Sequence, residues 1–172
     1  MPSRTLAALL LTSCAVVIIS IAQDKEPVWA LKFQDFAVSD IFQGKPALPI
    51  LATQAQRMFR TAIRRAVAKG PNFAGHFTIA AWGCGAGCVS AALVDTKTGR
   101  IYSMPFGSLS MPIQENEADR QYQGPVYQLK SRLFIADGCL DEDEKSCGTH
   151  YYEWKDHQFR LLRLDGLQVM TK

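Results

Sequence analysis

The stretch that decides the fold is residues 72–99, NFAGHFTIAAWGCGAGCVSAALVDTKTG. It contains two runs typical of strands, 76–82 and 88–95, separated by a glycine-rich turn. A second turn over 95–99 ends in glycine and leads into a third predicted strand over 100–104. Because the links between these runs are short, we expect the three strands to pair antiparallel.

Further strands are expected towards the C-terminus. Residues 126–136 predict one strand or two, and residues 149–154 and 158–164 predict two more, with a turn at Lys155-Asp156-His157 between them. The proline- and glycine-rich residues 105–125 predict a long loop, with one short helical turn around Glu115 to Gln121. A loop of this length in a compact domain is often functional.

Upstream of the hairpin, residues 51–69 predict one amphipathic helix, because apolar side chains recur at spacings of three and four. Gly70-Pro71 ends it. Residues 23–50 predict a short extended segment that packs on the core through Trp29, Leu31, Phe33 and Phe36, then a turn marked by Pro46 and Pro49. The expected class is α+β: one amphipathic helix packed on a curved antiparallel sheet of about six strands.

The composition fits a single compact domain. The chain has 172 residues, 48% hydrophobic side chains and a net charge of +3. That length suits one domain better than two. Charged residues at 20% and aromatic residues at 10% exclude disordered, collagen-like and coiled-coil proteins.

The N-terminus predicts export. Arg4 precedes an uncharged, mostly apolar run over residues 6–22 that ends in small residues. We expect a signal peptide over 1–22, cleaved after Ala22, and a single periplasmic or secreted domain over 23–172. Two alternatives remain open at this point: an uncleaved membrane anchor, and a lipoprotein carrying lipid on Cys14.

Four cysteines remain after the predicted cleavage, as the close pairs Cys84/Cys88 and Cys139/Cys147. In an oxidising compartment an even count predicts disulfides. Three pairings are possible, and the two local ones are favoured because each closes a short loop between strand-like segments. The alternative for Cys84 and Cys88 is redox chemistry, or a soft metal such as copper held together with His76.

The candidate binding residues cluster in the same stretch. Glycines at three alternate positions allow positive φ angles and close approach of a ligand, and a disulfide would reduce the entropy cost of binding. The candidates are Asn72, His76, Trp82, Gly83, Gly85 and Gly87. A tight structural hairpin and a core or capping histidine are the alternatives.

Other features carry weaker signals. The acidic run Asp141-Glu142-Asp143-Glu144 predicts a solvated loop tip or, less well, a calcium loop, since it lacks the spacing of calcium ligands. His150 and His157 are predicted to be surface residues of the last hairpin. No common enzyme motif is present in the sequence, and no cofactor or metal is expected.

The charge distribution suggests a basic face. Residues 41–94 contain six basic residues and no acidic one. Five of them share the predicted helix: Arg57, Arg60, Arg64, Arg65 and Lys69. This face is either solvated or an anion surface for an acidic partner or lipid headgroups. Nucleic acid is not an expected partner, because the protein is exported and no nucleic-acid module pattern is present.

Three segments carry a resemblance to a known family. Residues 72–77 (NFAGHF), 82–88 (WGCGAGC) and 94–102 (VDTKTGRIY) resemble a family of small secreted bacterial proteins with no assigned activity. Members often end in a Tyr-x-Trp hairpin, here Tyr152-Glu153-Trp154. The resemblance implies a bacterial source and an envelope or extracellular location.

The expected architecture is also similar to that of periplasmic lysozyme inhibitors. They too combine a signal peptide, a helix and an antiparallel sheet with a disulfide-closed loop. In that family the loop carries a histidine that enters the lysozyme active site. Here Gly85-Ala86-Gly87 stands between the cysteines, so only the architecture carries over.

Three functions fit these observations. The first is an exported, non-catalytic binding or inhibitor-like module that contacts a protein or a small anionic ligand through the Cys84–Cys88 loop. The second is a small periplasmic hydrolase, or a metal or redox protein, that uses His76 with Cys84 and Cys88. The third is an envelope protein held at the membrane by its N-terminus, with the basic helix face on anionic lipid.

Overall fold

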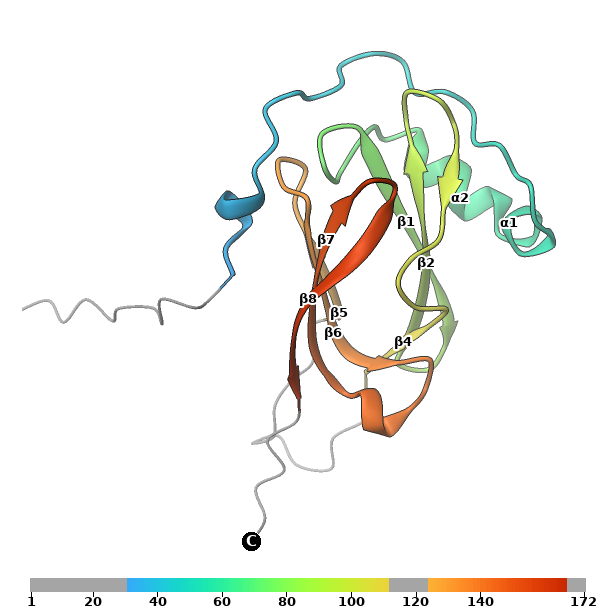
Figure 1. Ribbon diagram of the computed structural model, residues 1–172. Helices are drawn as coiled ribbons and strands as arrows, with labels where there is room; N and C mark the ends of the chain where they lie inside the picture. The colour runs from blue at the N-terminus through green and yellow to red at the C-terminus, as the bar shows by residue number, and fades with distance from the viewer. Residues whose placement is uncertain (1–30, 112–123, 167–172) are drawn as a thin grey trace, which may run out of the picture. The chain divides into compact units, whose positions relative to one another are not determined.

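The computed structural model describes residues 31–111 and 124–166, which form an open antiparallel sheet of eight strands (Figure 1). The strands are β1 (Phe77–Gly85), β2 (Cys88–Asp95), β3 (Ile101–Tyr102), β4 (Leu109–Ser110), β5 (Gly124–Tyr127), β6 (Leu133–Leu140), β7 (Gly148–Lys155) and β8 (Gln158–Gly166). Their order is β1-β2-β4-β6-β7-β8, with β3 also paired to β2 and β5 to β6. The predicted sheet-rich α+β class is confirmed.

The positions of β2 and of the turn in the last hairpin agree with the prediction from sequence. The second predicted strand, 88–95, has the bounds of β2. The last hairpin turns at Asp156 and His157, whose φ angles of 50° and 60° are left-handed. Such a two-residue turn matches the twist of the strands that flank it.

The sheet has eight strands rather than about six, because some pairing is not local. Residues 126–136, expected to form one strand or two, belong to two strands, β5 and β6, that pair with each other. β4 lies inside the predicted loop 105–125, where β2 and β6 pair with it on either side. The predicted strand 100–104 is reduced to the two residues of β3. The helical turn predicted around 115–121 lies outside the described residues.

The β1–β2 hairpin is the middle layer of the fold, because side chains on both of its faces are buried. Phe77, Ile79 and Leu93 belong to an inner core shared with β6, β7 and β8. Ala80 and Val94 belong to a second core on the opposite face. This alternation follows from the two-residue period of a strand.

Aromatic rings fill much of the inner core. Phe77 and Trp154 meet edge to face with ring centroids 5.3 Å apart, and Phe73 meets Phe134 in the same way at 6.3 Å. Both geometries are favoured by the charge distribution of the rings. Buried members of the core include Phe73, Phe77, Ile79, Leu93, Met104, Phe106, Leu109, Phe134, Tyr152 and Trp154.

The prediction of one continuous helix over residues 51–69 is wrong. Two helices are present in this segment, α1 (Gln54–Met58) and α2 (Arg60–Val67), and they meet at Phe59, whose backbone (φ −94°, ψ 16°) is not helical. The break places the Phe59 ring on Trp82 of β1, stacked at 4.6 Å. Ile63 and Val67 then pack α2 against the second core.

Within the described residues, neither helix is long and apolar enough to cross a membrane.

Residues 31–50, here called the strap, run over the end of the sheet where β1 begins (Figure 1). Backbone N–H groups of Val38, Phe42, Ala47 and Ile50 donate to the carbonyl oxygens of Lys130, Gly75, Thr96 and Gly99 at 2.8–3.0 Å. The segment expected to be extended contains instead a 3₁₀ helix, η1 (Phe33–Phe36). Leu31, Phe33 and Phe36 are half-buried, and Trp29 lies outside the described residues.

Two glycines allow the strap to approach this closely. At Gly75 (φ 82°) an added Cβ would lie 2.3 Å from the carbonyl oxygen of Asp40. At Gly99 (φ 78°) it would lie 2.1 Å from the carbonyl oxygen of Leu48. Both contacts are with backbone, which cannot move aside as a side chain can. These two positions therefore require glycine for space as well as for conformation.

We predict that Gly75→Ala destabilises the protein by about 2 kcal/mol more than Gly70→Ala, measured as free energy of unfolding in urea. Gly70 is a matched control, because its φ of 90° carries the same backbone strain while an added Cβ meets nothing within 4 Å. Equal losses in the two variants would mean that the strap does not constrain Gly75.

Candidate functional site

The residues proposed from sequence as one site lie in three places. His76 precedes β1, whereas Gly85 ends it. At the rise of an extended strand, the nine residue steps from His76 to Gly85 span roughly 30 Å. Trp82 lies between, on the face of β1 that carries the second core. His76 therefore does not lie with Cys84 and Cys88, and the geometry of a metal or redox centre built from all three is not present.

The first place is the tip of the β1–β2 hairpin. Cys84 and Cys88 are disulfide-bonded, as the local pairing predicted. Residues 83–87 are all exposed, and φ is positive at Gly85 (152°) and Gly87 (64°). The hairpin thus ends in a small, cross-linked loop with no large side chain, and its backbone is open to a partner.

The second disulfide, Cys139–Cys147, lies at the same end of the molecule and is buried. β4 connects the two bridges, because Ser110 pairs with Cys88 on one side and with Cys139 on the other. The Met111 N–H also donates to the carbonyl oxygen of Gly87 at 2.7 Å. The exposed tip is therefore braced by a second cross-linked strand pair.

The acidic run next to this end has a structural role. Asp141 Oδ1 accepts the backbone N–H groups of Gly107 (2.7 Å) and Ser108 (3.0 Å), and Asp143 caps the 3₁₀ helix η2 (Glu144–Ser146). All four acidic residues are exposed, as expected of a solvated loop. Within the described ranges, no group of three or more His, Cys, Asp or Glu side chains is placed to hold a metal ion.

The side chain of Asn72 has a structural role. Its Oδ1 accepts the backbone N–H of Ile79 at 2.7 Å, and its Nδ2 donates to the Ile79 carbonyl oxygen at 3.1 Å. The side chain thus pairs with β1 as a neighbouring strand would, which leaves one amide hydrogen and one lone pair for other partners.

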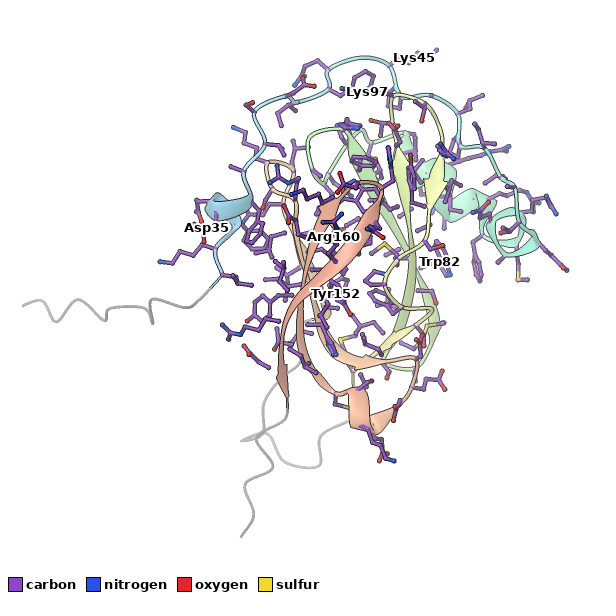
Figure 2. The ribbon with its side chains drawn as sticks, in the orientation of Figure 1. Asp35, Lys45, Trp82, Lys97, Tyr152 and Arg160 are labelled. Atoms are coloured by element: carbon purple, nitrogen blue, oxygen red, sulfur yellow. A yellow bond between two sulfur atoms is a disulfide. The ribbon has the colours of Figure 1, made fainter. Side chains whose placement is uncertain are left out.

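Trp82 lines a groove of about 600 Å³ between α1 and the segment 101–107. Figure 2 labels it beside the hairpin, on the side of the helices. Its ring stacks on Phe59, and its indole Nε1 is buried without a hydrogen-bond partner among the described residues. Tyr102 and Phe106 also line the groove, together with aliphatic and small polar residues.

His76 lies at the opposite end of β1 and lines a cavity of about 550 Å³. Its ring contacts Phe77 with centroids 4.2 Å apart, and no side chain of the described residues hydrogen-bonds to it. Burial lowers the pKa of His76, as does the charge of Lys97, while Asp95 and Asp40 oppose the shift. No carboxylate, hydroxyl or thiol is thus placed to pair with it as in a general-base site.

The sequence reasoning missed the other groups around this cavity. Asp40 comes from the strap, Arg132 from the start of β6, and Lys155 and His157 from the β7–β8 turn. These segments lie far apart in the chain, and no motif links them. Only the fold brings them to His76.

The prediction that His150 is a surface residue is wrong. It is 4% exposed, because it lies on the inner face of β7 with Tyr152, the two rings stacked at 6.3 Å. Burial lowers its pKa, against the opposing effects of the Ala136 and Gly148 backbone and of Asp137. Its Nδ1 has no hydrogen-bond partner among the described residues. His157, in contrast, is exposed as predicted.

The basic helix face is exposed at all five positions: Arg57, Arg60, Arg64, Arg65 and Lys69. Arg57 donates to the carbonyl oxygens of Leu51 and Ala52, and Arg60 donates to that of Arg57. Of the ion pairs formed by the described residues, none involves this face.

The fold and these surfaces define a disulfide-bonded, sheet-rich α+β protein with an exposed hairpin tip. Comparison with protein-family models, curated proteins and solved structures finds no match. The functional argument therefore rests on the geometry of the chain itself.

We predict that the free energy of unfolding falls as the pH drops below 6.5, the ordinary pKa of histidine. A buried histidine with a lowered pKa stays neutral in the folded protein at a pH at which the unfolded chain already takes up the proton. Its contribution to the free energy of unfolding is therefore complete above pH 6.5, and it is lost as the pH falls from 6.5 towards the lower pKa of the folded state. His150→Leu should flatten this dependence, measured by urea unfolding between pH 5 and 8. His157→Gln, at an exposed position, should keep the wild-type slope; equal slopes in all three proteins would contradict the assignment.

Proposed function

We propose that this chain is an exported bacterial envelope protein that acts as a non-catalytic binding module, with the β1–β2 hairpin tip as its contact element. The observation that carries the proposal is the exposed Cys84–Cys88 loop. Export through a signal peptide cleaved after Ala22 is part of the proposal, and two disulfides fit an oxidising compartment.

Rigidity favours this use of the tip. A loop that is ordered before it binds loses little conformational entropy on binding. Both faces of the hairpin are packed, and the disulfide and β4 hold its end. Gly83 and Gly85 face open space, because an added Cβ at either would meet nothing within 4 Å, so a partner with a narrow cleft suits this shape.

The tip proposal predicts position-specific cross-linking. A photo-crosslinking amino acid at Ala86, in the protein expressed in its own bacterium, should give a discrete protein adduct. The same amino acid at Thr61, exposed on α2, should not. Absence of an adduct from Ala86, or the same adduct from both positions, would refute the tip as the contact element.

The disulfide should matter for this contact more than for folding. The double variant Cys84→Ser/Cys88→Ser should lose roughly 2 kcal/mol of unfolding free energy, since the loop closed by the bridge is short. The variant should still unfold cooperatively in urea, as a folded protein does. The yield of the cross-linked adduct at Ala86 should nevertheless fall strongly. An undiminished adduct would show that bridging of the tip is not needed for binding.

A second candidate function is contact with anionic lipid, favoured by the unpaired basic helix face. The protein processed at Ala22 should co-sediment with phosphatidylglycerol vesicles at low salt, and less at high salt. Arg64→Gln/Arg65→Gln should reduce binding tenfold or more, at about 1 kcal/mol for each charge. The charge-matched control Lys130→Gln/Lys145→Gln should bind as wild type; equal losses would indicate attraction by net charge alone.

A further inference from the structure

The cavity at the strap end of β1 brings together four separate segments. It is bounded by the strap, the residues that precede β1, the start of β6 and the β7–β8 turn. Its volume of about 550 Å³ lies within the range of sites that hold small ligands. It is at the opposite end of β1 from the hairpin tip, so it is independent of the proposed contact element.

The carboxylates at this cavity already have partners. Asp40 pairs with Lys97 at 3.1 Å, and Asp156 pairs with Arg160. Figure 2 labels both of these basic partners at this end of the sheet. A ligand that enters the cavity therefore meets acidic groups whose charge is largely compensated.

Arg132 also lines the cavity, and it forms an ion pair with Glu153. Its guanidinium donates to Glu153 Oε1 from Nε (3.2 Å) and Nη2 (3.1 Å). Around the cavity, four cations (the lining residues and their ion-pair partners) face four carboxylates, because the charge of Asp95 also acts on His76. The charges therefore balance when both histidines are neutral, and Lys155 is the cation that has no ion pair among the described residues.

The groups that remain without an ion pair or hydrogen bond in the described chain are basic: His76, Lys155 and His157. The two rings are held by aromatic neighbours, His76 by Phe77 at 4.2 Å and His157 by Tyr102 at 5.6 Å. The His157 ring is stacked on Tyr102 and the His76 ring is tilted against Phe77, and neither contact uses a ring nitrogen. A neutral imidazole keeps one N–H to donate and an ammonium keeps three, so the free capacity of the site is mainly that of donors.

The rest of the lining is apolar. Phe77, Trp154, Val38 and Ala74 line the cavity, and Phe77 and Trp154 keep only 6% and 5% of their surface exposed. A fully hydrated inorganic ion gains nothing from such a wall, whereas a ligand with an apolar body does.

We infer that this cavity binds a small organic anion, in which a carboxylate or phosphate group meets Lys155, His76 and His157 while a flat apolar body lies against Phe77 and Trp154. Hydrogen bonds between charged groups are the stronger ones in proteins, and the anion supplies the acceptor that these donors lack. The inference does not depend on the function proposed for the hairpin tip.

The test is an NMR titration of the ¹⁵N-labelled protein processed at Ala22 with benzoate, phenyl phosphate and the neutral analogue benzamide. Backbone signals of residues 75–77 and 154–158 should shift saturably with at least one anion and not with benzamide. Saturation by benzoate would identify a carboxylate site, and saturation by phenyl phosphate alone a phosphate site. No saturable shift up to about 20 mM, where a Kd of 1 mM would be nearly saturated, would overturn the inference. Equal binding of benzamide would also overturn it.

A charge-matched pair of variants locates the binding. Lys155→Met should raise the Kd of the anion about tenfold, as expected for loss of a charged hydrogen bond. Lys145→Met removes the same charge from exposed η2, and it should leave the Kd unchanged. An equal effect of the two variants would show that the anion responds to net charge and not to this cavity.

Discussion

Burial of the β1–β2 hairpin on both faces is the constraint on which the rest of the structure depends. One face supplies Phe77 and Leu93 to the aromatic core, and the other supplies Ala80 and Val94 to the helix side. Thr78 is a fully buried polar residue of the hairpin, and its hydroxyl donates to the Gly70 carbonyl oxygen at 2.8 Å. Because the hairpin is held from both sides, its two ends are fixed in position: the cross-linked loop at one and the His76 cavity at the other.

Features governed by neighbouring residues could be predicted from the sequence. Strand periodicity gave the bounds of β2, and turn chemistry identified the last hairpin. Pairing of cysteines four and eight residues apart followed from the short loops between them. The hairpin tip, as a candidate site, belongs to this group, because a glycine-rich turn and its bridge are contained in a few consecutive residues.

Features that depend on distant segments could not be predicted. β4 is two residues long and exists because β2 and β6 pair with it. The helix breaks at Phe59, whose ring stacks on Trp82, and the apolar spacing in residues 51–69 contains no information about that contact. His150 is buried because its face of β7 packs towards the interior. The sequence of the last hairpin alone does not show which of its two faces does so. The cavity lined by His76 likewise combines four segments, and its other charged groups lie in no motif.

The strap has a consequence for the order of assembly. Its residues leave the ribosome, and any export channel, before every segment to which they bond: the Ser131 hydroxyl that donates to the Phe33 carbonyl oxygen follows it by 98 positions. Closing so long a loop is slow compared with forming a hairpin. The first part of the strap, which bonds to Lys130, Ser131 and Arg132, therefore completes its contacts only after the start of β6 has emerged, whereas Phe42, Ala47 and Ile50 bond to residues 75–99. Among the described residues, the start of the strap is thus made first and completes its contacts late.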